Sequence, residues 1–245
     1  MSAQSPPSAA PQVASRRSRA KSDRRNQLIT AAERLMARHG YLAVRLEDIG
    51  AAAGVSGPAI YRHFPNKEAL LVELLVGIST RLLAGANEVA KGTDDAEAAL
   101  ESLIDFHLDF ALAESDLIRI QDRDLGNLPP AAKRQVRRKQ RQYVEIWVDV
   151  LRRRDPTLTE TDARLTAHAT FGLLNSTSHS VKPDVKPDVK PDVKPDVKPD
   201  VKPDVKPDPK TDAKLHTAIP AETRPRAVLR AMTVAAVNSA GQLFE

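Results

Sequence analysis

Apolar residues recur along this chain at the spacing of amphipathic helices. In residues 22–39, Leu28, Ala31 and Leu35 fall three or four positions apart, which places them on one helix face. No segment carries the alternating Val, Ile, Thr and Tyr pattern of a β-strand. The sequence therefore predicts an all-α fold. The predicted helices cover residues 22–39, 46–53, 56–64, 67–83, 95–113, 115–120, 131–153, 160–174 and 226–240.

Several helix ends have recognisable capping residues. Gly40 follows the first helix at the position where a left-handed residue is usually needed, and Gly54 ends the second helix. Asn66, after a proline, is placed to cap the helix that begins at residue 67. Thr159 and Asp162 resemble a capping box at the start of the eighth helix. These residues fix where the chain is expected to turn.

Two segments differ from the helical pattern. Residues 1–21 are rich in Ser, Pro and Ala and are expected to be disordered. Residues 181–208 are seven consecutive copies of Val-Lys-Pro-Asp, and a proline at every fourth position blocks a helix. This repeat predicts a solvated, polyproline-like spacer. A slippage expansion in a tolerant loop explains it more simply than a function does.

The net charge of +5 is concentrated near the N-terminus. Residues 1–25 contain six Lys or Arg and one Asp, so the rest of the chain is neutral overall. A basic arm suits a polyanionic partner, because Lys and Arg release counterions from a phosphate backbone. A solvated tail that binds no partner would have the same composition, so both interpretations of the arm stay open.

The sequence offers little for catalysis. It contains no cysteine, its six histidines show no metal-ligand spacing, and it has neither a nucleophile motif nor a phosphate-binding glycine loop. We therefore expect no enzyme activity, no cofactor and no metal. The longest apolar run, residues 69–78, is interrupted by Glu73 and is too short for a bilayer. With no secretion signal, the expected location is the cytoplasm, without membrane contact.

Residues 45–64 have the pattern of a helix-turn-helix motif. Two short predicted helices are joined by a tight turn in which Val55 is the apolar residue. Ile49 and Ala53 face the contact between the helices, and Ile60 fixes the second helix to the core. The positions left exposed on the second helix are Gly57, Pro58, Ala59, Tyr61, Arg62 and His63. Their side chains can contact phosphates or base edges in duplex DNA.

The stretch Ala53–Leu70, AGVSGPAIYRHFPNKEAL, resembles the signature of the tetracycline-repressor (TetR) family. Gly40-Tyr41 and Glu47-Asp48-Ile49 match as well, so the resemblance covers about residues 24–71. Beyond this region only the number and spacing of helices agree. The resemblance implies a three-helix DNA-binding domain followed by a helical ligand-binding and dimerisation domain.

The resemblance also implies roles for individual residues. The major-groove end of the recognition helix would comprise Ser56, Gly57, Pro58 and Ala59. Tyr61 and His63 would hold the phosphate backbone, with Lys67 and the start of its helix binding a further phosphate. Two adjacent positions depart from the family pattern: Val44 cannot cap a helix, and Arg45 would replace a hydroxyl contact by charge. Phe64 would pack inside the domain.

In the helical body, the resemblance implies a ligand pocket whose filling shifts the helix after residue 67. The candidate pocket residues are Phe106, His107, Phe110, Tyr143, Trp147 and Phe171. His107 lies on an apolar stripe, where a histidine is more often a satisfied core residue than a ligand contact. The stripe favours a largely apolar small-molecule effector, such as an acyl-CoA-like thioester or a lipid. The last two helices would pair in a homodimer.

The predicted parts are a disordered basic arm (1–21), a helix-turn-helix DNA-binding domain (22–70, motif 45–64), a helical regulatory domain (71–180), the repeat spacer (181–210) and a C-terminal dimerisation helix (211–245). Together they predict a dimeric regulator, most often a repressor, that a ligand releases from a pseudo-palindromic operator in double-stranded DNA. Two alternatives remain: a nonspecific architectural DNA-binding protein without a small ligand, and an adaptor that uses the spacer to bind another protein.

Overall fold

The computed structural model describes residues 10–176 and 224–242, and every regular element within these ranges is helical. The helices are α1 (Ala10–His39), α2 (Leu46–Ala52), α3 (Gly57–Ile60), α4 (Lys67–Lys91), α5 (Ala96–Ala113), α6 (Ser115–Asp124), the 3₁₀ turn η1 (Leu125–Asn127), α7 (Pro130–Arg154), α8 (Glu160–Asn175) and α9 (Arg224–Gln242). The all-α prediction is confirmed. The repeat at 181–208 lies outside the described residues.

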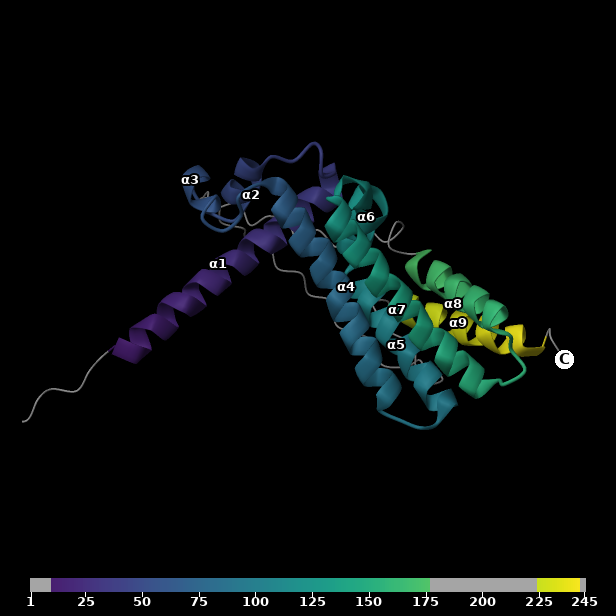
Figure 1. Ribbon diagram of the computed structural model, residues 1–245. Helices are drawn as coiled ribbons and strands as arrows, with labels where there is room; N and C mark the ends of the chain where they lie inside the picture. The colour runs from purple at the N-terminus through teal and green to yellow at the C-terminus, as the bar shows by residue number, and fades with distance from the viewer. Residues whose placement is uncertain (1–9, 177–223, 243–245) are drawn as a thin grey trace, which may run out of the picture.

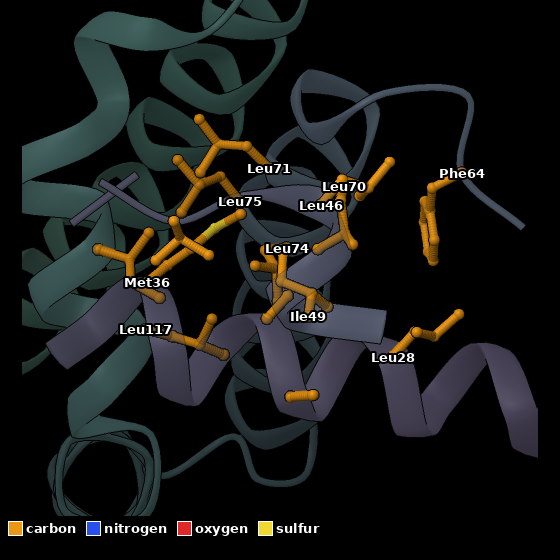
Figure 2. Packing of buried hydrophobic residues seen from close by; sticks show 14 of the residues in the cluster. Leu28, Met36, Leu46, Ile49, Phe64, Leu70, Leu71, Leu74, Leu75 and Leu117 are labelled. Carbon is orange, nitrogen blue, oxygen red and sulfur yellow. The ribbon is translucent and has the colours of Figure 1, made fainter. Parts of the chain in front are cut away.

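The N-terminal part of the fold is a small head built from α1, α2, α3 and the first turns of α4 (Figure 1). Its apolar side chains converge in one cluster, shown in Figure 2. Leu28, Ile49 and Phe64 are each at most 1% exposed there. Full burial of a side chain of this size contributes roughly 1.5–3 kcal/mol. The head therefore has enough apolar contact to hold α2 and α3 in a fixed orientation.

This apolar cluster does not stop at the end of the head. Leu74 and Leu75 of α4 join it to Leu117 of α6 and Val136 of α7. The boundary expected between residues 70 and 71 falls inside the continuous helix α4. Head and body are thus connected through a shared core as well as through the chain.

The body consists of α4, α5 and α7 side by side, with α8 and α9 against α7 and α5 (Figure 1). A second apolar cluster fills it, with Trp147 completely buried and Leu103 beside it. Arg226 and Arg230 of α9 pair with Asp105 of α5, each at 3.0 Å. These pairs are partly exposed, so each contributes little stability. Their geometry fixes the position of α9 along α5.

One expectation about the N-terminus is corrected. Residues 10–21, which were predicted to be disordered, form the beginning of α1. The helix thus starts at Ala10 rather than near Ser22, because the Ala, Arg and Lys residues of this stretch are strong helix formers. This part of α1 extends away from the rest of the molecule (Figure 1).

Helix α4 is longer than predicted, since it ends at Lys91 rather than near Leu83. Its 25 residues have a mean hydropathy of 1.7 over the most apolar window, so it is long and apolar enough to cross a membrane, contrary to the estimate from residues 69–78. The core helix of a folded protein meets the same criteria. Here α4 packs against α1, α5, α6 and α7, which accounts for its apolar composition.

The C-terminal end of α6 holds the end of α1. The Arg123 guanidinium donates to the carbonyl oxygens of Met36 and Ala37 in the last turn of α1, where the Met36 carbonyl also accepts from the Gly40 N–H at 2.8 Å. Asp124, which is buried, accepts a hydrogen bond from the Tyr41 backbone N–H at 3.3 Å. Gly40, with φ +87°, allows the turn at this point. We call these contacts the α6–α1 junction.

A carboxylate near this junction makes stability depend on pH. Burial and the nearby Glu114 and Asp116 raise the pKa of Glu33 from 4.5 to about 7, against the opposing effect of Arg81. The folded state thus binds this proton more tightly than the unfolded chain. Its stabilisation is complete below pH 4.5 and is lost as the pH rises through about 7.

We therefore expect Glu33→Gln to gain stability relative to the wild type as the pH rises from 5 to 8, because the variant lacks this loss. Urea titrations across this range measure the difference. Glu88→Gln, at an exposed position of α4, serves as the control and should keep the wild-type slope. Identical slopes in all three proteins would contradict the assignment to Glu33.

Candidate DNA-binding surface and ligand cavity

The turn between α2 and α3 is tightly packed. A Cβ on Gly50 would lie 3.2 Å from the Val55 carbonyl oxygen and 3.6 Å from the Ile60 side chain, so only glycine fits without displacement. The Val55 N–H donates to the Gly50 carbonyl at 2.8 Å. Gly54 adopts φ +64°, a conformation that favours glycine. The structure thus shows the close helix pair that the spacing predicts.

The second helix of this pair is shorter than predicted. α3 ends at Ile60, and the next residues continue as turns in which the Phe64 N–H still donates to the Ile60 carbonyl at 3.0 Å. Ser56 has the extended backbone of an N-cap residue, but its side chain makes no capping hydrogen bond. Of the positions predicted to face DNA, Ser56, Pro58, Tyr61 and Arg62 are exposed, while Gly57, Ala59 and His63 are half-buried.

Tyr61 has a specific partner in the protein. Its hydroxyl donates to Glu47 Oε1 of α2 at 2.6 Å, and its side chain remains half exposed. This hydrogen bond lowers the pKa of Glu47 and raises the pKa of Tyr61. A phosphate contact from Tyr61 therefore has to replace a hydrogen bond to an ionised carboxylate.

Lys67 is placed differently from its predicted role at a phosphate. Its ammonium donates to the carbonyl oxygens of Tyr41 at 2.6 Å and Val44 at 2.7 Å, and more weakly to that of Leu42. It also lies 4.4 Å from the centre of the Tyr41 ring. The physical reason is local: the loop before α2 turns its carbonyls toward the start of α4, where a lysine can satisfy them. Lys67 thus holds the loop between α1 and α2.

The N-terminus of α2 is stabilised by a carboxylate instead of a capping hydroxyl. Arg45 occupies the N-cap position, and Val44 is buried in the head. The Asp48 carboxylate accepts a hydrogen bond from the Arg45 backbone N–H at 3.0 Å. A carboxylate in the first turn also interacts favourably with the helix dipole. The Arg45 side chain is exposed beside α2, which is consistent with its predicted contact to DNA.

Basic residues of α1 add to this surface, and the residue-by-residue predictions omit them. Arg24 donates to the Ala53 carbonyl at 3.5 Å, and Arg25 donates to the His63 carbonyl at 3.2 Å. Burial, with Lys21 and these two arginines nearby, lowers the pKa of His63. His63 therefore favours its neutral form. The helical spacing of residues 21, 24 and 25 could have revealed this cluster if α1 had been extended toward the N-terminus.

The body contains a cavity of about 270 Å³ beneath the head. Its lining comes from α4, α5, α6, α7 and α8, and comprises Ile78, Ser79, Leu82, His107, Phe110, Leu117, Ile118, Gln121, Asp122, Lys139, Gln140, Tyr143, Val144, His168, Phe171 and Asn175. Four of the six predicted pocket residues are among them. Because α6 contributes Leu117 and Gln121, one helix both lines the cavity and forms the α6–α1 junction.

His107 is both a cavity residue and a satisfied buried residue. Its Nδ1 lies 2.7 Å from the Tyr143 hydroxyl, and its Nε2 lies 3.1 Å from Asn175 Oδ1. Burial lowers the pKa of His107 to about 4 and raises the pKa of Tyr143, so both are neutral near pH 7. Since the amide oxygen accepts from Nε2–H, the Tyr143 hydroxyl donates to Nδ1. The cavity wall is therefore polar but uncharged at this point.

Two predicted pocket residues lie outside the cavity. Trp147 is fully buried behind it, with its ring 5.1 Å from Phe171 in an edge-to-face contact. Phe106 packs between helices, against Gly85 of α4, where a Cβ would lie 2.4 Å from the phenyl ring. Neither side chain is among the cavity's lining residues, so the prediction that these two line the pocket is corrected. Trp147 fills the core, and Phe106 is partly buried and packs against it.

A helix-turn-helix head on a helical body is the architecture of a class of DNA-binding transcriptional regulators. Residues 28–74 match the family described as bacterial regulatory proteins, tetR family, and residues 93–184 match the tetracyclin repressor-like C-terminal domain. Together the two matches cover more than half of the chain. The chain belongs to the TetR family.

Individual relatives are more distant. The HTH-type transcriptional repressor KstR2 of Rhodococcus jostii is 28% identical over 132 residues, which cover 54% of this chain and 65% of the relative. The chain thus spans less than two thirds of the length of the curated relatives that it matches first.

Solved structures show the same fold. A TetR-family regulator from Bordetella parapertussis superposes with a TM-score of 0.61 at 25% identity, covering 66% of this chain and 85% of that one. FadR from Bacillus subtilis, solved in complex with stearoyl-CoA, superposes with a TM-score of 0.51 at 23% identity, covering 63% and 84%. At that identity the second likeness concerns the fold alone.

Proposed function

We propose that this protein is a sequence-specific transcriptional regulator that binds a pseudo-palindromic operator as a homodimer and is released by a small ligand. The observation that carries the proposal is the exposed surface of α3 and the turn after it, where Pro58, Tyr61 and Arg62 face solvent on a tightly packed helix pair. Lys21 and Arg24 flank this surface with positive charge. The centre of such a surface can contact base edges in the DNA groove, and the basic residues on either side can contact phosphates. We infer a repressor in the cytoplasm.

The dimer is proposed to form through α8 and α9. Leu165 of α8 is 66% exposed, and Val228 and Met232 of α9 are 55% and 52% exposed, which is unusual for large apolar side chains. A hollow of about 250 Å³ between the two helices is lined by small and apolar residues such as Leu173 and Ala236. A second copy would cover this face and hold two heads apart, as reading two half-sites requires.

The ligand is proposed to be largely apolar. Aromatic and aliphatic side chains such as Phe110 and Leu117 line the cavity beside the neutral pair His107 and Tyr143. Further polar side chains, among them Asp122 and Lys139, complete the lining. Sites of this kind usually bind apolar ligands and orient them through a few polar groups. FadR of the same fold was solved with stearoyl-CoA, which supports an acyl-CoA-like ligand here.

The proposal is tested by selecting bound fragments from the genome of the source organism and footprinting them. We expect two protected half-sites about one helical turn apart and affinity that falls steeply with salt. Arg62→Ala should weaken operator binding about tenfold or more. Arg152→Ala, at the far end of α7, is the matched control and should bind as the wild type does. Uniform coating of DNA would support the architectural alternative instead, and a strictly monomeric protein would exclude the proposed dimer.

A further inference from the structure

A surface groove adjoins the cavity along α7. Three of the cavity's lining residues, Gln140, Val144 and His168, also line this groove between α7 and α8. The groove in turn shares Arg137 and Arg141 with a neighbouring depression on α7. Cavity, groove and depression therefore lie next to one another along α7, and we call this series of hollows the path.

Four arginines follow this path on one side of α7. Positions 134, 137, 138 and 141 are separated by one, three or four residues, so their side chains lie along one helix face. We call Arg134, Arg137, Arg138 and Arg141 the α7 arginine track. Val144, which lines both the cavity and the groove, lies ten residues from Arg134 at the start of the track, a distance of about 15 Å at about 1.5 Å per residue.

Among the residues that the structure describes, no acidic side chain pairs with the track. Residues 130–143 contain six Lys or Arg and no Asp or Glu. Within the part of the chain that the structure describes, the track arginines form no salt bridge, whereas Arg153 pairs with Asp149 and Arg164 pairs with Glu145. Like charges three or four residues apart destabilise a helix. A bound anion would remove this repulsion.

The cavity itself carries no excess of positive charge. Asp122 is the one carboxylate among its lining residues and Lys139 is the one Lys or Arg, and aliphatic and aromatic side chains such as Leu117 and Phe110 line it together with neutral polar groups. A volume of about 270 Å³ holds roughly nine groups of the size of a water molecule, at about 30 Å³ each. The path thus accepts a short apolar chain at one end and several negative charges at the other.

We propose that the α7 arginine track binds the phosphate groups of an acyl-CoA whose acyl chain, of about eight carbons, fills the cavity. This inference rests on the proposed function, because it identifies the ligand of the same cavity. Arginine binds phosphate through paired hydrogen bonds in a fixed plane, and four of them provide sites for more than one phosphate. A DNA backbone would also suit an arginine cluster, but the position of the track next to the cavity along α7 favours the ligand.

The test compares octanoyl-CoA with octanoyl-pantetheine, which has the same acyl chain and thioester but lacks the phosphates. Isothermal titration calorimetry on the full chain measures both. The double variant Arg137→Gln, Arg141→Gln should bind octanoyl-CoA at least tenfold more weakly than the wild type does. Its affinity for octanoyl-pantetheine should be unchanged. Arg152→Gln with Arg153→Gln, on the same helix away from the cavity, is the matched control and should change neither. Stearoyl-CoA should bind more weakly than octanoyl-CoA to the wild type.

Three results would overturn the proposal: equal weakening of both ligands, tighter binding of octanoyl-pantetheine than of octanoyl-CoA to the wild type, or loss of DNA affinity in the Arg137/Arg141 variant without ligand. The last would assign the track to DNA. If the Arg137/Arg141 variant binds the operator normally but no longer binds octanoyl-CoA, the track is confirmed as the phosphate-binding site of the ligand. If neither the wild type nor any variant binds an operator, the proposed function fails. The calorimetry still shows whether the α7 arginine track binds the phosphates of the acyl-CoA.

Discussion

Replacing Trp147 with alanine should lower the free energy of unfolding by roughly 3–5 kcal/mol, the usual cost of truncating a large buried aromatic residue. Trp147 is 0% exposed and contacts the rings of Phe171 and His107, so the space that it leaves cannot be filled by small adjustments. Urea unfolding followed by circular dichroism at one protein concentration measures the change. Tryptophan fluorescence cannot be used for the variant, because Trp147 is the only tryptophan in the chain.

The matched control is Leu42→Ala. Leu42 is 79% exposed, so its truncation should alter stability by no more than about 0.5 kcal/mol. The Trp147→Ala variant also connects new space to the back of the cavity. If Trp147→Ala were as stable as the control, the second apolar cluster would not be the core of the body.

Replacing Lys67 with methionine should destabilise the head by about 2 kcal/mol, because the change leaves the Tyr41 and Val44 carbonyls without their charged donor. Methionine keeps the apolar stem of the side chain, so the loss of stability measures the contribution of the ammonium group alone. Affinity for every DNA sequence should fall together with the melting temperature. Thermal unfolding and gel-shift titrations on the same preparations measure the two effects.

Arg62→Met separates this structural role from direct DNA contact. Arg62 is exposed, so its replacement should reduce DNA affinity without changing the melting temperature. If Lys67→Met behaved in the same way, with unchanged stability, Lys67 would be a phosphate contact, as the family resemblance implies. The pair of variants therefore distinguishes the two roles of a basic residue in the same motif.

The sequence predicted the helices well because their signals are local. Apolar spacing along one segment and a capping residue at its start, such as Asn66 for α4, do not depend on distant parts of the chain. The Thr159 hydroxyl likewise accepts from the Asp162 N–H, as its sequence suggested. Helix ends without strong caps were less predictable: α1 starts earlier and α4 ends later than expected.

The roles of individual side chains depended on packing that no local pattern contains. Tyr143 and Trp147 lie on the same predicted face of α7, four residues apart, yet one lines the cavity and the other fills the core behind it. The partner of Lys67 is a loop more than twenty residues earlier in the chain. Arg123 holds the end of α1 across a still larger separation. Contacts of this kind require the arrangement of helices, not only their positions in the sequence.

The double use of α6 has a thermodynamic consequence. This helix lines the cavity through Leu117 and fixes α1 through Arg123, so its position is common to the cavity and the head. For the regulator proposed above, linkage is reciprocal: whatever factor a ligand in the cavity imposes on operator affinity, the operator imposes on ligand affinity. A regulator molecule seated on its promoter should then respond at a higher inducer concentration than one free in the cell. The dose needed for induction would shift with the number of promoter copies.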